Sequence, residues 1–295
     1  MNEYTLLWDG NNLVHRLFYR HGGKLLVDNG NDAGLVNAVF NEMRRVGHLL
    51  DTDKHVFTWD SYSWRKKHFP EYKAHRKKDP VKAKIIKNIN KQIDIIRTTL
   101  KAIGLLTFRI EEFEADDLMA SLIYRFTNPV IISTDQDYLQ LLDDCNVFDP
   151  MKGNLWDRNK FAMHYGFEAR RYIDVKCLAG DKSDNVPGVP GWGDTGAKKL
   201  IQEYESLDNV WEEMHPKTKK QKILFTDEAR EIIYRNHFLM ALRTWTSLDT
   251  VLDNEIADHE NLSYSDDLLK KVLLRYGLLG YCEEPALTLK SIVIK

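Results

Sequence analysis

The chain has 295 residues, of which 43% are hydrophobic and 29% are charged, and its formal net charge is −2. This balance indicates a globular protein rather than a disordered one, and the length suits one large domain with a smaller one. The three cysteines are widely spaced and form no CxxC pair, which argues against a disulfide framework and a structural zinc site. The sequence shows no signal peptide and no run of about 20 apolar residues, so we expect a cytoplasmic protein without a membrane span.

Short apolar runs alternate with helical periods in the N-terminal half. Strands are predicted at residues 4–8, 55–59, 104–110 and 129–133, with a shorter one at 146–148. Helical periods follow the first strand, cover 35–50, and begin again at Glu114. This alternation predicts an α/β fold with a mostly parallel sheet, right-handed crossovers and flanking helices. In such sheets, ligands gather at the carboxyl ends of the strands.

Acidic residues follow each of the four longer predicted strands. In strand order they are Asp9; Asp60; Glu114, Asp116 and Asp117; and Asp135 with Asp137. Each alone could be a turn residue or an acid favoured by a helix dipole. Four sets at one sheet edge would repel each other by about 1 kcal/mol per pair at 4 Å, even in water. Such a cluster needs bound cations or raised pKa values.

Two more acids, Asp181 and Asp184, lie in the segment Gly-Asp-Lys-Ser-Asp-Asn. Their i, i+3 spacing would place them on one face if this turn were helical, and the alternative is a polar loop. Oxygen ligands without paired His or Cys favour Mg²⁺ or Mn²⁺ over Zn²⁺. The carboxylates are too many for one magnesium ion, so we expect two ions, the arrangement that stabilises attacking and leaving oxygens in phosphodiester cleavage.

A basic stretch follows Asp60. Between Arg65 and Lys91 there are 11 Lys or Arg residues against two acids. Aromatic residues are mixed with these cations up to Lys78, which suits single-stranded nucleic acid, while the alternative is a solvated basic loop. Because the stretch starts beside Asp60, a cation here could neutralise charge on a scissile phosphate. Helical periodicity resumes after Pro80, which suggests a break in the segment.

A glycine-rich turn occupies residues 186–196, before a helix predicted to start near Thr195. Its backbone N–H groups and the helix N-terminus could form an anion site that fits phosphate. Lys198 and Lys199 follow directly. The alternative is an ordinary connection between helices.

The ordered motifs resemble the flap endonuclease / 5′-3′ exonuclease family, as found in bacteriophage 5′-nucleases and the 5′-nuclease domain of bacterial DNA polymerase I. The motifs are Trp-Asp-Gly-Asn-Asn, Thr-Trp-Asp, Glu-Tyr-Lys-Ala-His-Arg, Phe-Glu-Ala-Asp-Asp, Ser-Thr-Asp-Gln-Asp, Gly-Asp-Lys-Ser-Asp-Asn and Val-Pro-Gly-Val-Pro-Gly-Trp-Gly. The resemblance implies a PIN-like nuclease core at residues 1–165 with a helical arch at about 61–100. It also implies a helical region at 166–295 with a helix–three-turn–helix at about 177–205.

The resemblance also implies roles for individual residues. Asp9, Asp60, Glu114, Asp116 and Asp117 form a first-metal group, Asp137, Asp181 and Asp184 form a second, and Asp135 lies between them. Lys73 and Arg76 are the catalytic cations of the arch. The DNA-binding candidates are Arg65, Tyr72, Lys77, Gly188, Gly191, Gly193, Lys198 and Lys199. Backbone carbonyls of Leu178, Ala179, Pro187, Val189 and Trp192 would hold K⁺, although Trp192 departs from the aliphatic residue usual there.

The activity that this resemblance implies is a Mg²⁺-dependent 5′-nuclease, with Mn²⁺ able to substitute. Its substrates would be DNA with 5′ single-stranded ends, flaps or nicks, and RNA in RNA–DNA hybrids. A monomer working with a single-strand-binding protein or a polymerase is expected. The alternatives are a PIN-type ribonuclease and a structure-specific DNA-binding protein without catalysis, although unneutralised carboxylates would repel DNA in the latter.

Overall fold

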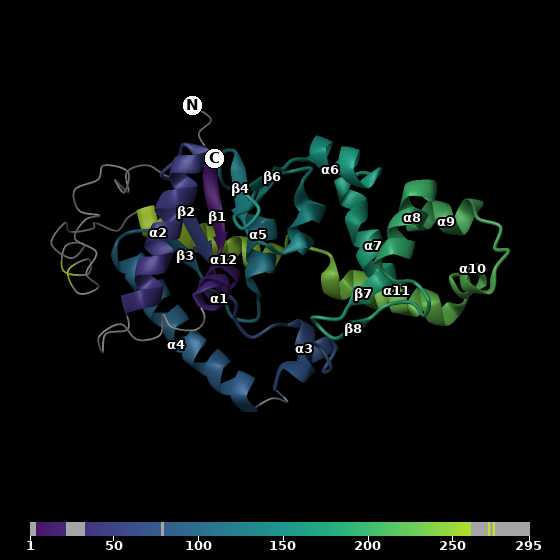
Figure 1. Cartoon of the computed structure of the whole chain (residues 1–295), viewed down its shortest axis with the longest axis horizontal. Helices are drawn as coiled ribbons and strands as arrows, with labels where there is room; N and C mark the ends of the chain where they lie inside the picture. Colours follow the sequence, from purple (N-terminus) through teal and green to yellow (C-terminus); the bar gives the residue numbers. More distant parts are fainter. Residues whose placement is uncertain (1–3, 22–32, 78–79, 261–270, 272–273, 275–295) are drawn as a thin grey trace.

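The computed structural model describes residues 4–21, 33–77, 80–260, 271 and 274. Figure 1 shows an elongated molecule in which a sheet with its helices lies beside a second, helical part. None of the described helices is long and apolar enough to cross a membrane.

Six strands form the main sheet, in the order β3-β2-β1-β4-β5-β6. They are β1 (Thr5–Asp9), β2 (His55–Thr58), β3 (Leu106–Phe108), β4 (Pro129–Ile132), β5 (Asn146–Asp149) and β6 (Asn154–Trp156). The first five are parallel and β6 is antiparallel to β5. All five predicted strands are present. The sequence analysis missed β6, whose three residues are half-buried and carry no apolar run.

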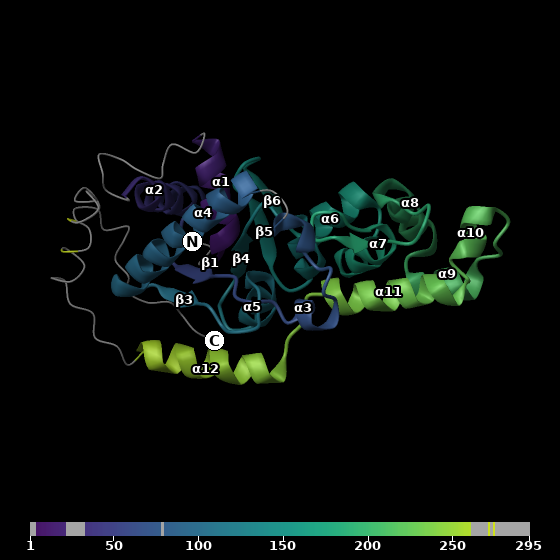
Figure 2. The same cartoon turned by 90° about the horizontal axis from the view of Figure 1, so that it is seen from below.

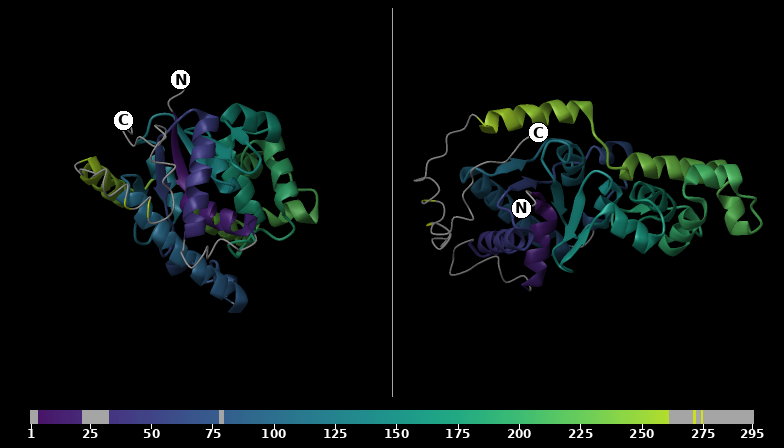
Figure 3. Two further views of the ribbon diagram at one scale, coloured as in Figure 1. Left: turned by 60° about the vertical axis from the view of Figure 1, so that its left-hand side comes forward. Right: turned by 90° about the horizontal axis from the view of Figure 1, so that it is seen from above.

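The central strands are continuous apolar runs because both faces of the sheet are covered. Side chains of Leu7, Val56 and Ile131 point into one core, and those of Leu6, Trp8 and Phe57 into the other. The second core is closed by α1 (Gly10–Arg20), α2 (Ala33–Leu50) and α4 (Pro80–Ala102). Opposite them, α5 (Ala115–Leu122) and α12 (Thr246–Glu260) cover the first core, as Figures 2 and 3 show from below and above.

The predicted arch consists of α3 (Arg65–His68), the 3₁₀ helix η2 (Ala74–Lys77) and α4. Pro80 does not break α4, because it occupies the first helical position, where its missing N–H is not needed. The expected break is therefore not inside α4. Ile89, Ile93 and Ile96 of α4 are buried in the second core, so much of this helix packs on the main sheet.

The helical part shares the first core with the sheet. Its elements are α6 (Arg158–Tyr165), η4 (Ala169–Arg171), α7 (Tyr172–Ala179), α8 (Asp194–Tyr204), α9 (Leu207–Glu213), α10 (Lys219–Ile223) and α11 (Asp227–Met240). The α7–α8 connection contains a two-stranded pairing of β7 (Gly180–Asp181) with β8 (Val186–Pro187). Buried Asn236 of α11 donates to the carbonyls of Cys177 and Pro187, at 2.9 and 3.0 Å. This amide ties α11 to α7 and to β8.

The α7–α8 connection requires glycine at two positions where backbones nearly touch. A Cβ on Gly188 would lie 2.3 Å from the carbonyl oxygen of Leu178, and one on Gly180 would lie 2.3 Å from the amide nitrogen of Gly188. Gly180 also has a φ of +71°, which side-chain-bearing residues rarely adopt. The packing of the turn therefore accounts for Gly188 without a contact to DNA.

Candidate active site

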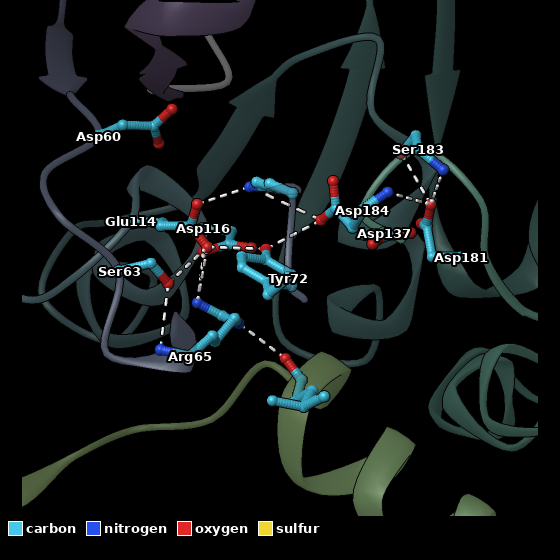
Figure 4. A network of polar contacts seen from close by, with 12 residues as sticks. Asp60, Ser63, Arg65, Tyr72, Glu114, Asp116, Asp137, Asp181, Ser183 and Asp184 are labelled. Atoms are coloured by element: carbon cyan, nitrogen blue, oxygen red, sulfur yellow. Dashed lines mark hydrogen bonds and ion pairs between the residues drawn. The ribbon is translucent and has the colours of Figure 1, made fainter. Parts of the chain in front are cut away.

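One cavity of about 280 Å³ lies at the carboxyl ends of the parallel strands, and we call it the acidic cavity. Eight of the nine predicted acids line it: Asp9, Asp60, Glu114, Asp116, Asp135, Asp137, Asp181 and Asp184. Figure 4 shows Asp60, Glu114 and Asp116 on one side, facing Asp137, Asp181 and Asp184 on the other. The structure thus brings together acids that are distant in the sequence, because parallel strands end at the same sheet edge.

Asp9 is the residue that caps α1 at the end of β1. Its carboxylate accepts hydrogen bonds from the backbone N–H of Asn12 at 2.9 Å and the hydroxyls of Tyr138 and Ser133 at 3.0 and 3.3 Å. Burial, followed by the charge of Asp60, raises the pKa of Asp9 to about 6. A cation in the acidic cavity would favour the ionised carboxylate.

Four residues of the predicted arch contact Glu114. Its Oε2 accepts from the hydroxyls of Ser63 and Tyr72 at 3.0 and 2.8 Å and from Arg65 at 3.1 Å, and its Oε1 lies 2.5 Å from Lys73 Nζ. Burial alone would raise the pKa of Glu114, but Lys73 and Arg65 hold it at about 2. Glu114 is therefore ionised and anchored to the arch.

Asp117, predicted as a metal ligand, pairs with Arg65. Its side chain is 1% exposed, and its two oxygens accept from Arg65 at 2.8 and 2.9 Å. It also accepts from the backbone N–H of Glu114 at 3.0 Å, as the third residue of a capping box does. These contacts argue against Asp117 as a direct metal ligand, because its oxygens are already used and sealed from the cavity.

The burial of Arg65 argues against its predicted contact with DNA, because the side chain is inside the protein. Arg65 is 1% exposed, and besides Asp117 and Glu114 it donates to the carbonyl oxygen of Leu239 at 2.7 Å. This guanidinium therefore joins the arch, the acidic cavity and the end of α11 (Figure 4).

Tyr72 is also buried, at 2% exposure, so its ring is not available to a DNA base as predicted. Its hydroxyl lies 2.8 Å from Glu114 Oε2 and 2.9 Å from Asp184 Oδ2, and so links the two sides of the acidic cavity. The neighbouring Lys73 lines the cavity and has a left-handed φ of +55°. Its backbone N–H donates to the carbonyl of Asp184 at 2.8 Å, which helps to hold this conformation. Arg76 and Lys77 lie in η2, but their side chains are outside the described part.

A cation that the sequence analysis missed contacts two acids on the second side of the acidic cavity. Lys176 Nζ lies 2.7 Å from Asp137 Oδ1 and 2.6 Å from Asp181 Oδ2. Burial and the charge of Asp135 raise the pKa of Asp137 to about 7. Burial alone would raise the pKa of Asp181, but Lys176 lowers it to about 2. Lys176 lies in the last turn of α7, and no sequence signal marks it, because its pairing with Asp137 depends on the tertiary fold.

Asp181 and Asp184 do not lie on a helical face, which was one possibility that their spacing suggested. The segment between β7 and β8 is a turn, in which Asp181 Oδ1 accepts from the backbone N–H of Ser183 and Asp184, at 2.7 and 3.1 Å. Both carboxylates nevertheless line the acidic cavity. The polar-loop alternative is therefore correct for the local structure.

The donor set of the acidic cavity fits hard divalent ions, because carboxylate oxygens predominate and neither His nor Cys pairs are present among its lining residues. Within the described part of the chain, no three Asp, Glu, His or Cys side chains form a ready coordination shell. Ion binding would therefore require these acids to adjust. Mutual repulsion is relieved here by the ammonium groups of Lys73 and Lys176 and by raised pKa values at Asp9 and Asp137.

The glycine-rich turn presents the remaining candidates for DNA contact. Gly191, Gly193 and Lys199 are exposed, and a Cβ on Gly193 would meet nothing within 4 Å. Lys198 is half-buried and pairs with Asp194 at 2.9 Å. Duplex binding by this surface stays a prediction.

Several of the carbonyl oxygens predicted to bind K⁺ already accept hydrogen bonds. The carbonyl oxygen of Pro187 accepts from Arg235 at 2.6 Å and from Asn236 at 3.0 Å, which uses both of its lone pairs. The carbonyls of Leu178 and Val189 accept from backbone N–H groups at 2.8 and 3.0 Å. These contacts argue against Pro187 as a K⁺ ligand, and the ion itself stays a prediction.

Comparison with known proteins places this arrangement in a family. A family model described as "5′-3′ exonuclease, N-terminal resolvase-like domain" matches residues 4–166, and one described as "5′-3′ exonuclease, C-terminal SAM fold" matches residues 167–261. DNA polymerase I of Caldicellulosiruptor bescii is 32% identical over 225 residues, which cover 71% of this chain and 25% of that protein. A 5′-3′ exonuclease of Bacillus subtilis is 31% identical over 237 residues, covering 75% of this chain and 78% of that protein.

Among solved structures, the T5 D15 protein co-crystallised with metal ions has a TM-score of 0.68 and 20% sequence identity, over 93% of this chain and all of that chain. This likeness shows a common fold. The chain belongs to the 5′-3′ exonuclease family. The resemblance inferred from the motif order is therefore confirmed, as is the α/β fold with a C-terminal helical region. The chain spans about a quarter of the length of the DNA polymerase I relatives that it matches.

Proposed function

We propose that this protein is a divalent-metal-dependent 5′-nuclease that hydrolyses phosphodiester bonds of DNA at 5′ ends and 5′ flaps. The observation that supports this function is the acidic cavity, in which eight carboxylates from strand ends and the β7–β8 turn face each other. The Bacillus subtilis relative, which the chain matches over 78% of that protein's length, is named a 5′-3′ exonuclease. In this proposal, residues 1–165 form the nuclease core, and residues 166–295 form the region that docks the duplex.

The acidic cavity would hold two ions, Mg²⁺ in the cell and Mn²⁺ as a substitute. Asp9, Asp60, Glu114 and Asp116 would hold the first, Asp137, Asp181 and Asp184 would hold the second, and Asp135 lies between the groups. When bound, such ions neutralise the acids, generate a nucleophile from water and stabilise the charge on the attacked phosphate.

Lys73 would act directly on the substrate. Its ammonium lies between the two acidic groups, 2.5 Å from Glu114 Oε1 and 3.6 Å from Asp184 Oδ2. A scissile phosphate in the acidic cavity would compete for this cation and gain a charge-assisted hydrogen bond. Arg76, which follows Lys73 in the chain and belongs to η2, would contribute a second positive charge.

The duplex would dock on the glycine-rich turn, with Lys199 and the exposed backbone of Gly191 and Gly193 meeting phosphates. The 5′ single strand would meet the basic arch. RNA in RNA–DNA hybrids is a further substrate in this proposal, and a polymerase or a single-strand-binding protein is a further partner. The working form would be a monomer.

The test is cleavage of a labelled 5′-flap substrate in Mg²⁺, with product mapping. We expect Asp135→Ala and Asp181→Ala to lose most activity, while Asp253→Asn, which changes an exposed acid of α12 that pairs with Arg125, stays active. Full activity in both cavity variants would reject the proposal. Matched RNA substrates distinguish a ribonuclease, and tight binding in EDTA without turnover in Mg²⁺ or Mn²⁺ would indicate a DNA-binding protein without catalysis.

A further inference from the structure

Lys176 pairs with two acids of the acidic cavity, and the proposed function leaves it unexplained. It lies on α7, and its side chain is 15% exposed. Its ammonium bridges Asp137, which follows β4, and Asp181, which follows α7, at 2.7 and 2.6 Å. These two carboxylates come from different elements and are both candidates for the second ion. The lysine therefore contacts the same oxygen atoms that an ion would need.

A divalent ion that binds these two oxygens would compete with this ammonium. Mg²⁺ binds carboxylate oxygens at about 2.0–2.1 Å, whereas the Lys176 nitrogen is already within hydrogen-bonding distance of both. An ion on Asp137 Oδ1 and Asp181 Oδ2 would lie next to a positive charge in a partly buried site. The lysine stem has four flexible carbons, so the ammonium can swing away without movement of the backbone.

The acids beside the end of β1 differ in the groups that donate hydrogen bonds to them. Within the described part of the chain, Asp9 and Asp135 accept hydrogen bonds from hydroxyl and backbone N–H donors rather than from ammonium groups. Lys73, which lines the cavity, pairs with Glu114 and Asp184. An ion that binds beside Asp9 therefore replaces no ammonium on that carboxylate. Lys73 opposes ion binding at both positions, because Glu114 belongs to the first group and Asp184 to the second. Lys176 contacts acids of the second group only, so the two positions should differ in affinity.

We propose that Lys176 is a built-in counterion that occupies the second ion position and must leave it before a divalent ion binds there. This inference rests on the proposed function. Lys176 would set the order of ion binding, the position near Asp9 first and the position near Asp137 and Asp181 second. If the displaced arrangement is populated at about 10% or less, the apparent affinity of the second position falls by at least about 10-fold.

The test is Mn²⁺ binding to the full chain without DNA, followed by the paramagnetic resonance signal of free Mn²⁺. We expect the wild-type protein to show one tighter and one weaker position, with the weaker position lost in Asp181→Asn. In Lys176→Met and Lys176→Gln, the weaker position should tighten by at least about 10-fold, while the tighter one changes by less than about threefold. The control Lys152→Met removes an exposed lysine of the β5–β6 turn and should match the wild-type protein.

A second measurement covers the effect of Lys176 on folding. In EDTA, Lys176→Met should unfold at a lower temperature than the wild-type protein, because Asp137 and Asp181 then face each other without a counterion. Mn²⁺ should raise its unfolding temperature by more than it raises that of the wild-type protein. If both positions weaken in the variants, or if the second is unchanged, Lys176 is a positioning residue and the inference is wrong. If no variant binds Mn²⁺, the proposed function fails as well.

Discussion

Arg65→Met tests whether Asp117 has a structural role, as the partner of Arg65, rather than a role in ion binding. The change removes a buried guanidinium that contacts Asp117 through two hydrogen bonds, Glu114 through one and the Leu239 carbonyl through another. Asp117, at 1% exposure, would be left as a buried charge without its counterion. Breaking a buried pair in this way costs about 3–5 kcal/mol, a large part of the roughly 5–15 kcal/mol that typically stabilises a domain.

The assay is urea unfolding at pH 7 in EDTA, and the matched control is Arg170→Met. Arg170 pairs with Glu168 at 62% and 61% exposure, so its loss should change the free energy of unfolding by about 1 kcal/mol or less. The double variant Arg65→Met/Asp117→Asn should recover at least about 1 kcal/mol, because it removes the stranded charge. A loss below about 1 kcal/mol in Arg65→Met, or no recovery in the double variant, would refute the structural role of the pair.

Three further substitutions test the packing and charge of the site. Gly188→Ala should lower the free energy of unfolding by about 1–3 kcal/mol, because the new Cβ would meet backbone atoms at 2.3 Å. Gly193→Ala is the control and should change this free energy little, because a Cβ there would meet open space. Equal effects of the two substitutions in urea unfolding would contradict this reasoning. Tyr72→Phe should lower the free energy of unfolding by about 1.5–3 kcal/mol, because Glu114 loses a hydroxyl donor. An unchanged free energy in the same assay would show that this hydrogen bond does not stabilise the site. In EDTA, the wild-type protein should gain stability as pH falls from about 7 to about 5, because the folded pKa values of Asp9, about 6, and Asp137, about 7, exceed the usual value of about 3.9. Asp9→Asn should reduce this pH dependence of the unfolding temperature, and identical slopes would exclude Asp9 as its source.

Much of the fold and of the acidic cavity could be predicted from local sequence patterns. Apolar runs that end at an acid identify parallel strands, and the geometry of such a sheet then brings Asp9, Asp60 and Asp135 to one edge without further information. The five parallel strands followed from the same runs. β6 was missed because its half-buried residues carry no apolar period.

Local patterns were insufficient where a residue's role depends on a partner far away in the sequence. Asp116 and Asp117 are neighbours in one helical turn, but Asp116 lines the acidic cavity, whereas Asp117 faces Arg65, 52 residues away. Burial of Arg65 and Tyr72 was likewise invisible in a stretch whose composition is typical of an exposed basic surface. Lys176 was missed because a single lysine in a short helix forms no pattern, and its pairing with Asp137 depends on the tertiary fold.

The central claim is that the facing carboxylates of the acidic cavity bind two divalent ions. The most direct measurement is an anomalous-scattering map from crystals of the full chain soaked in Mn²⁺. The account predicts two peaks inside the cavity, one beside Asp9 and Asp60 and one beside Asp137 and Asp181, with the Lys176 ammonium moved away from the second. A cavity without peaks, or peaks held by acids elsewhere on the surface, would contradict it.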